Sequence, residues 1–175
     1  MIATGVAIGS EPEPYRLDYL LRCDARYVTR EVRVGSEGDG WARTLELRRS
    51  EDAWLVEVEQ HGTARLADAG GDATSLTDAM DADLGLSPLF NTMPVLRHRL
   101  HIEPGSEDFV MVWISVPDLA LHRSRQRYVH VATSGREHVV RFRSLDEDVP
   151  FTSDLVFDAD GIVVDYPGLA TRIGP

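Results

Sequence analysis

Two carboxylates lie one residue apart near the middle of the chain, and this spacing allows shared chemistry. Asp81 and Asp83 flank Ala82 in a short acidic segment with strand character, so both side chains would point to the same face. Paired carboxylates can bind a divalent cation or share a proton. The neighbouring residues fix no third oxygen ligand. The pair therefore predicts hydrogen bonds or caps for the following loop, with a metal site as the less favoured alternative.

Six histidines and one cysteine are the other residues suited to metal or nucleophilic chemistry. His98 and His101 would lie on opposite faces of a strand expected over Met93–Ile102, so they would not bind one ion together. The single cysteine, Cys23, excludes an intramolecular disulfide and a thiolate cluster. No nucleophile elbow, dinucleotide fingerprint or Walker loop occurs. We expect no metal and no cofactor.

Arginine supplies all 18 basic residues, and the chain contains no lysine. Schiff-base and P-loop lysine chemistry are therefore excluded. Neighbouring strands would gather several arginines into a positive strip that binds a phosphate or carboxylate group. The favoured alternative is cross-strand ion pairing with glutamates on other outward faces. The arginines concerned are Arg97, Arg99, Arg123, Arg125, Arg127, Arg141 and Arg143, and the glutamates are Glu46, Glu57 and Glu59.

The 175 residues include 29 acidic and 18 basic side chains, which gives a formal net charge of −11. This charge disfavours non-specific binding to nucleic acid and docking on anionic membranes. No segment reaches the roughly 20 apolar residues that span a bilayer, and the first residues lack the pattern of a signal peptide. We therefore expect a cytoplasmic protein, a monomer or small homo-oligomer, with no nucleic-acid partner and no integral membrane segment.

Period-two alternation predicts about ten or eleven strands and very little helix. Tyr15–Cys23 alternates clearly, and Asp108–Val116 is apolar on both faces, as in a central strand covered on both sides. Short helical turns are expected at Ser75–Asp81, with Ser75 as N-cap, and at Pro117–Arg125. The other expected strands are Arg26–Val34, Ala42–Arg49, Ala53–Glu59, Met93–Ile102, Arg127–Thr133, His138–Leu145, Phe151–Asp158 and Ile162–Tyr166.

Short strands at this spacing are typical of an all-β barrel, roll or sandwich. No linker, internal repeat or low-complexity segment divides the chain. We therefore expect a single domain over residues 1–175.

Three ordered blocks of the sequence match the motifs of one family. The first contains Asp81-Ala82-Asp83-Leu84, Ser87-Pro88 and Asn91-Thr92-Met93-Pro94, with Arg97 and Arg99 after them. The second is Gln126-Arg127-Tyr128, and the third joins Asp158-x-Asp160-Gly161 to Asp165-Tyr166-Pro167-Gly168-Leu169. In these blocks the chain resembles a bacterial family described as putative glycolipid-binding, formerly a domain of unknown function.

The resemblance implies an all-β fold, an antiparallel spiral β-roll or open barrel with at most one or two short helices, similar to bacterial lipoprotein carriers. It assigns motif or structural roles to Asp81, Asp83, Pro88, Thr92, Pro94, Asp165 and Pro167. An apolar concave face in such a roll would hold acyl chains, and an ordinary filled core is the open alternative. The side chains suited to that lining are Tyr15, Leu17, Tyr19, Phe109, Met111 and Trp113.

We therefore expect a non-enzymatic protein that binds an amphipathic small molecule or glycolipid. Two alternatives stay open. One is a small hydrolase-like enzyme of unrecognised class that uses Asp81 or Asp83, which a raised carboxyl pKa inside a cleft would favour. The other is a protein-interaction module, which an exposed apolar patch would favour. The polar ligand contacts are expected from Asn91, Arg97, Gln126, Tyr128 and Tyr166.

Overall fold

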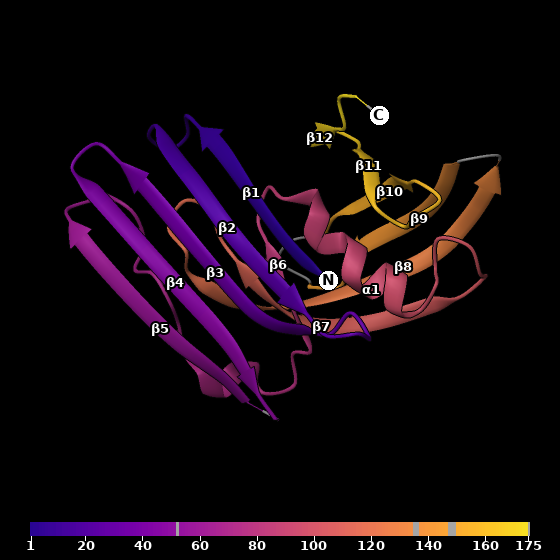
Figure 1. Ribbon diagram of the computed structural model, residues 1–175, viewed down its shortest axis with the longest axis horizontal. Coiled ribbons are helices and arrows are strands. Elements are labelled where there is room, and N and C mark those ends of the chain that lie inside the picture. The colour runs from indigo at the N-terminus through magenta and orange to yellow at the C-terminus, as the bar shows by residue number, and fades with distance from the viewer. Residues whose placement is uncertain (52, 135–136, 147–149, 175) are drawn as a thin grey trace.

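The computed structural model describes residues 1–51, 53–134, 137–146 and 150–174, whose strands form two sheets (Figure 1). The first sheet is an antiparallel meander in which each strand pairs with the next along the chain. Its strands are β1 (Ile2–Gly9), β2 (Tyr15–Cys23), β3 (Thr29–Gly38), β4 (Trp41–Ser50) and β5 (Ala53–Gly62).

The second sheet curls into a half-barrel. In spatial order it contains β12 (Ala170–Thr171), β11 (Val163–Tyr166), β10 (Thr152–Phe157), β9 (Glu137–Ser144), β8 (Leu121–Ser134), β7 (Ser106–Ile114) and β6 (Asp81–Leu84). Within this sheet β6 runs parallel to β7, and the other neighbours are antiparallel. The expected all-β fold with few helices is confirmed.

The expected strand over Met93–Ile102 is wrong, because this segment begins as helix. A 3₁₀-turn, η2 (Pro88–Asn91), leads directly into α1 (Thr92–Arg97), which lies against the curled sheet (Figure 1). Pro88 opens the 3₁₀-turn and Pro94 lies in the first turn of α1, where a missing N–H costs little. Consecutive residues from Thr92 to Val95 are all buried, which a two-faced strand pattern does not produce.

Two smaller expectations about helical turns also differ from the structure. The turn near residue 75 is η1 (Ala73–Leu76), and its N-cap is Asp72, which accepts a hydrogen bond from the Thr74 amide, and not Ser75. No helix forms over Pro117–Arg125, since β8 already begins at Leu121. The strand β1 was not expected at all, because its glycines and alanines give little strand signal.

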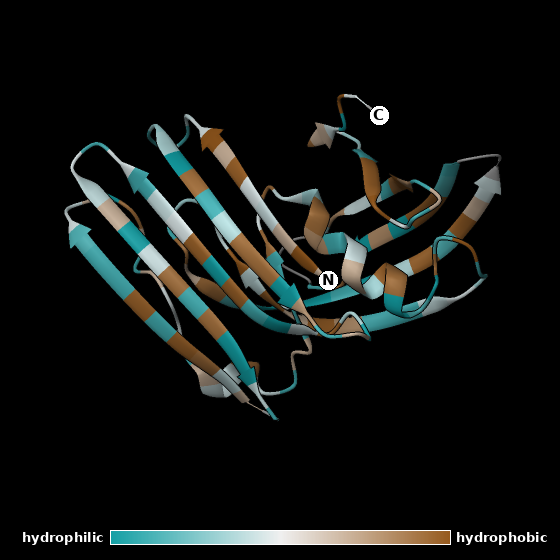
Figure 2. Ribbon diagram, in the orientation of Figure 1, coloured by the Kyte–Doolittle hydropathy of each residue, from teal (hydrophilic) through white to brown (hydrophobic). Residues whose placement is uncertain are grey.

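The protein has two clusters of buried apolar side chains. The larger includes residues of β2–β5 together with Val112 and Ile114 of β7, and Figure 2 shows the matching alternation of apolar and polar bands along the first sheet. The second lies between α1 and the curled sheet. Tyr15, Leu17 and Met111 are at most 6% exposed, so for these residues the filled core is correct and an open acyl lining is wrong.

The expectation that Asp108–Val116 is covered on both sides holds for the centre of β7 but not for Trp113, which is 37% exposed. Met111, Val112 and Ile114 all have no exposed surface, although neighbouring side chains of a strand point to opposite faces. No helix in the described part of the chain combines the length and the apolar character needed to cross a membrane.

Candidate functional site

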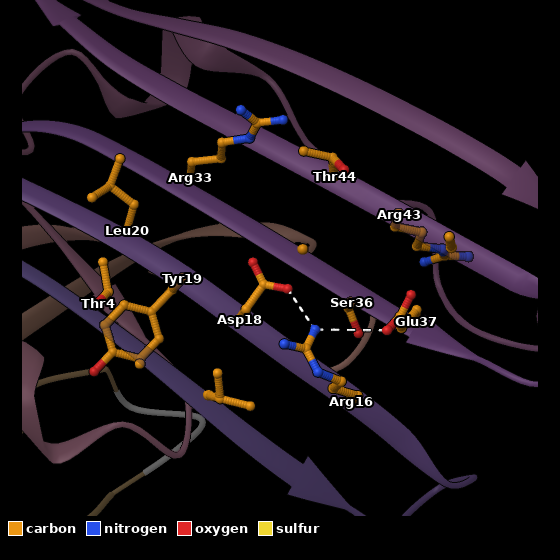
Figure 3. A pocket seen from close by; sticks show the side chains of 14 residues that line it. Thr4, Arg16, Asp18, Tyr19, Leu20, Arg33, Ser36, Glu37, Arg43 and Thr44 are labelled. Carbon is orange, nitrogen blue, oxygen red and sulfur yellow. Dashed lines mark hydrogen bonds and ion pairs between the residues drawn. The ribbon is translucent and has the colours of Figure 1, made fainter.

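Two hollows on the surface of the described residues are large enough for a small molecule. One, of about 820 Å³, lies over strands β1–β4 on the face of the first sheet that points away from the core (Figure 3). Arg16 lies 2.8 Å from Asp18 and 3.6 Å from Glu37 there, so these exposed charges already compensate one another (Figure 3). We regard this hollow as a surface trough of outward-pointing side chains.

The second hollow, of about 560 Å³, lies at one end of the curled sheet, and we call it the barrel-end pocket. The ends of β6, β7, β9 and β11 and the first half of β8 meet here, together with the loop after β6. Its lining is Asp83, Leu84, Gly85, Leu86, Ser87, Asn91, Trp113, His122, Arg123, Ser124, Gln126, Phe142, Ser144, Asp146, Phe151, Tyr166 and Leu169.

A chain of three hydrogen bonds crosses the floor of the barrel-end pocket. Asn91 donates from Nδ2 to the Tyr128 hydroxyl at 2.7 Å, and that hydroxyl donates to Oε1 of Gln126 at 3.0 Å. Gln126 then donates from Nε2 to Oδ2 of Asp83 at 2.7 Å. Asn91, Gln126 and Tyr128 are at most 4% exposed, so the chain is held inside the protein and ends at a carboxyl group on the pocket.

Burial raises the pKa of Asp83 to about 6, and the hydrogen bond from Gln126 only partly offsets that rise. Oδ1 of Asp83 accepts no hydrogen bond from any residue that the structure describes. Burial, followed by the nearby Asp83 charge, also raises the pKa values of Tyr128 and Tyr166 above the ordinary range of tyrosine. Both phenols therefore remain protonated donors near a carboxyl group that titrates close to neutral pH.

Exposed apolar side chains gather around the mouth of the pocket. Leu86 is 62% exposed, Phe151 44%, Leu169 39% and Trp113 37%, although residues of this size are usually buried. Leu86 adopts a left-handed φ of 61°, a conformation that leucine rarely takes. The pocket thus combines polar groups at its floor with an apolar rim, the usual composition of a small-molecule site.

The pocket offers almost no free positive charge. Arg123, the one guanidinium group among the described lining residues, makes a bidentate contact with Asp78, with one N–O distance of 3.0 Å. Asp146, a second carboxylate in the lining, accepts hydrogen bonds from the backbone amide of Arg125 at 3.0 and 3.3 Å. Hydroxyl, amide and carboxyl groups are therefore the main polar groups that a ligand would meet in the described lining.

The five residues expected to contact a ligand do not all meet. Asn91, Gln126 and Tyr166 line the barrel-end pocket, and Tyr128 lies beneath it as the link between Asn91 and Gln126. Arg97 lies elsewhere, donating to both carboxylate oxygens of Asp81 at 3.2 and 2.5 Å.

Asp81 and Asp83 have different partners, although they point the same way from β6. Asp81 also accepts hydrogen bonds from the amide and hydroxyl of Thr29 in β3, at 3.1 and 3.2 Å. Neither carboxylate accepts a hydrogen bond from the loop that directly follows β6, so the expectation that the pair would cap this loop is wrong. In the described residues no three His, Cys, Asp or Glu side chains come together as a metal site would require.

The other motif residues have positions that suit a structural role. Pro88 opens η2, Thr92 and Pro94 are buried in α1, Asp165 accepts a hydrogen bond from the Thr171 hydroxyl, and Pro167 lies in the exposed turn after β11.

The arginines of the expected strip are largely neutralised by carboxylates. Ion pairing is thus the better description, but with partners other than the expected Glu46, Glu57 and Glu59. The pairs are Arg97–Asp81, Arg99–Glu103, Arg123–Asp78, Arg127–Asp108 and Arg141–Asp154.

Three rim residues, Leu86, Phe151 and Leu169, were not among the expected ligand contacts. Each lies in or beside a loop, so strand periodicity carries no information about its direction. An isolated large apolar residue next to Gly or Pro, as at Gly85-Leu86 and Pro150-Phe151, is the only sequence signal that marks them.

Comparison with known proteins identifies one family and one similar structure. The family model described as Putative glycolipid-binding matches residues 1–172. A crystal structure of a DUF1089 family protein from Pseudomonas aeruginosa is similar over 98% of this chain and 92% of that chain, with 25% sequence identity and a TM-score of 0.75. No curated protein matches the chain.

Proposed function

The chain belongs to the Putative glycolipid-binding family, and from that premise we propose that it binds an uncharged, sugar-bearing amphiphile in the barrel-end pocket. The observation that carries the proposal is the arrangement of that pocket: Asp83 and its hydrogen-bond chain form the floor, and exposed apolar side chains form the rim. A glycolipid has the same two parts, a hydroxyl-rich head and an apolar tail.

The floor suits the head of such a molecule. Sugar hydroxyls donate and accept hydrogen bonds, and Oδ1 of Asp83 accepts while the protonated Tyr166 hydroxyl donates. The faces of a sugar ring carry C–H groups that pack against aromatic rings such as Trp113. Because Gln126 is fixed by Tyr128, the carboxyl group it holds is oriented before the ligand arrives, which lowers the cost of binding.

The charges of the pocket favour a neutral head over an anionic one. Asp83 and Asp146 would repel a phosphate, and Arg123 is already paired with Asp78. Arginine clusters are the usual solution for phosphate groups, and the lining residues that the structure describes include a single arginine. We therefore assign the head to neutral glycosides.

The tail would lie along the rim. Leu86, Phe151 and Leu169 form an apolar border at the mouth, whereas the interior between the sheets is filled by packed side chains. Only part of an alkyl chain would be covered, so the affinity should rise with the first few methylene groups and then level off, at about 0.8 kcal/mol for each methylene that is buried.

The experiment is a titration with dodecyl maltoside below its micelle concentration, followed by tryptophan fluorescence. Trp113 is 37% exposed in the pocket, and Trp41 and Trp54 are at most 5% exposed, so a ligand in the pocket should change mainly the emission of Trp113. Asp83→Ala should weaken binding at least tenfold, a loss of about 1.4 kcal/mol. Asp108→Ala, at an exposed carboxylate outside the pocket, is the matched control.

Dodecyl phosphate supplies the comparison of head groups. It should bind at least tenfold more weakly than the maltoside, also at high salt, where the overall negative charge of the protein is screened. Equal binding of both probes, or equal binding by Asp83→Ala and Asp108→Ala, would overturn the proposal.

A second candidate function is glycoside cleavage at the same place. The observation that favours it is the raised pKa of Asp83, which suits a proton donor, together with Asp146 as a second carboxylate in the lining. Dodecyl maltoside incubated with the protein near pH 5.5 decides between the two functions. Released sugar that disappears in Asp83→Asn would identify an enzyme, and an intact glycoside after saturation would leave binding alone.

A further inference from the structure

A second group of exposed apolar residues lies on β1, at the edge of the first sheet (Figure 1). Ile2 is 66% exposed, Val6 63% and Ile8 86%, and with Thr4 they share the face that points away from the core. The strand contains no charged residue, and Figure 2 draws it in brown and pale tones. An open, uncharged edge strand is a template for pairing with another strand.

The opposite edge of the same sheet is protected. Strand β5 places Glu57 and Glu59 in exposed positions, and charges along an edge discourage pairing between chains. One edge strand of this sheet, β5, therefore carries exposed charges, and the other, β1, carries none. The apolar character of β1 is thus not a general property of the edges of this sheet.

Two hydrogen bonds identify the backbone groups that β1 leaves free. The Cys23 amide donates to the Met1 carbonyl at 2.9 Å, and the Met1 amino group donates to the Cys23 carbonyl at 3.1 Å. This reciprocal pair fixes the alternation of the ladder, so odd-numbered residues of β1 direct their N–H and C=O groups to β2. Ile2, Thr4, Val6 and Ile8 therefore direct theirs to the open edge.

The sequence of β1 is nearly symmetric about Gly5. At mirrored positions on the two sides of that glycine, Thr4 corresponds to its isostere Val6, Ala3 to Ala7 and Ile2 to Ile8. An antiparallel strand pair related by a twofold axis needs this property, because each residue then meets the residue at the mirrored position of the other copy. The even-numbered residues would be the hydrogen-bonded pairs of such a ladder.

The centre of the strand is also suited to a close approach. A Cβ atom on Gly5 would lie 2.4 Å from the Tyr19 ring, so this ring covers the inner face of β1 where a larger residue would otherwise stand. The residues opposite each other at the twofold axis would then be two glycines, which bring no side chain into the contact.

We propose that β1 pairs antiparallel with β1 of a second copy of this chain, with Thr4 opposite Val6 and Ile2 opposite Ile8, so that the two five-stranded sheets become one. The contact supplies partners for the free backbone groups of β1 and brings the apolar side chains of the two copies side by side on one sheet face. It also brings no acidic residue of β1 against another, although each chain carries a net charge of −11.

The test is sedimentation velocity across a concentration series reaching about 100 µM, because a dimer forms by mass action. The unaltered protein should sediment as a dimer, at twice 19.5 kDa. Thr4→Lys with Val6→Lys places like charges opposite each other in the two Thr4–Val6 pairs of the seam and should give a monomer. Thr4→Lys with Val6→Glu is the matched control, since the same register now pairs opposite charges and should restore the dimer.

A third variant keeps the test independent of charge. Val6→Pro removes an N–H group that faces the open edge and spares those that bond to β2, so it should also give a monomer, with circular dichroism as the check on folding. A wild-type monomer at every concentration would overturn the proposal. Equal behaviour of the two double variants would overturn the register, and with it the proposed pairing.

Discussion

Gln126 donates a 2.7 Å hydrogen bond from Nε2 to Oδ2 of Asp83, and this bond decides which oxygen of the carboxyl group is left for a ligand. The amide cannot turn over freely, since its own Oε1 accepts from the Tyr128 hydroxyl. The buried Gln126 thus sets the orientation of the Asp83 carboxyl group in the pocket.

Asp83→Asn should stabilise the protein at neutral pH. The pKa of Asp83 is about 6 in the folded state against an ordinary 3.8, so between these values the folded protein binds more protons than the unfolded chain. The free energy of unfolding therefore falls as the pH rises through this window. Asparagine removes the penalty, which is about 3 kcal/mol at pH 7 for a shift of this size. Urea unfolding should show that the free energies of unfolding of wild type and Asp83→Asn differ at pH 7 and converge near pH 4. The same difference at pH 7 and at pH 4 would contradict this prediction.

Arg97→Met should destabilise the fold strongly. The Arg97 and Asp81 side chains are only 12% and 1% exposed, and removing the guanidinium leaves a buried carboxylate without its charged partner. Such changes cost about 3–5 kcal/mol. Arg127→Met breaks an exposed pair with Asp108 and should cost less than about 1 kcal/mol. Chemical unfolding measures the free energy of unfolding of both variants. Similar losses of stability would show that burial does not decide how much each ion pair contributes.

Leu86→Gly should raise stability while lowering affinity. Its φ of 61° is costly for leucine and accessible to glycine, so the substitution should stabilise the fold by up to about 1 kcal/mol. The same change removes an apolar side chain from the rim of the pocket. Thermal unfolding should therefore show a higher melting temperature for Leu86→Gly, and titration should show a lower affinity for dodecyl maltoside. Unchanged affinity would exclude Leu86 from the binding surface.

Tyr128→Phe should weaken binding, although residue 128 lies beneath the pocket and does not line it. The hydroxyl is buried and bonded to both Asn91 and Gln126, and its loss leaves their polar atoms unsatisfied, at a cost of about 1–3 kcal/mol. Gln126 would then no longer be fixed toward Asp83. Tyr19→Phe is the control, because no hydrogen bond of the Tyr19 hydroxyl exists among the described residues. Calorimetric titration with dodecyl maltoside should separate the two variants.

Much of the fold follows from local alternation. The range predicted for Tyr15–Cys23 coincides with β2, and Met111 and Val112 of β7 are buried on opposite faces as expected. Periodicity failed where other constraints dominate. Residues around Pro94 mimic a strand but fold as α1, since a proline is tolerated in a first helical turn, and β1 is hidden by glycines that make room for tyrosine rings of β2.

The candidate site was harder to predict than the fold. Motif resemblance singled out Asn91, Gln126 and Tyr166, which do line one pocket. It also included Arg97, whose bond to Asp81 depends on a helix that alternation did not reveal. The apolar rim is assembled from loops about 80 residues apart, between Leu86 and Leu169, and only the curling of the second sheet brings them together.

The most direct measurement is the indole region of an ¹H–¹⁵N correlation spectrum during titration with dodecyl maltoside below its micelle concentration. The protein has three tryptophans, of which only Trp113 lines the barrel-end pocket. The proposed function predicts a saturable shift of the Trp113 indole signal, with Trp41 and Trp54 unchanged, and no such shift in Asp83→Ala. A shift of Trp41 or Trp54 instead, or no saturable shift at any tryptophan, would contradict binding in this pocket.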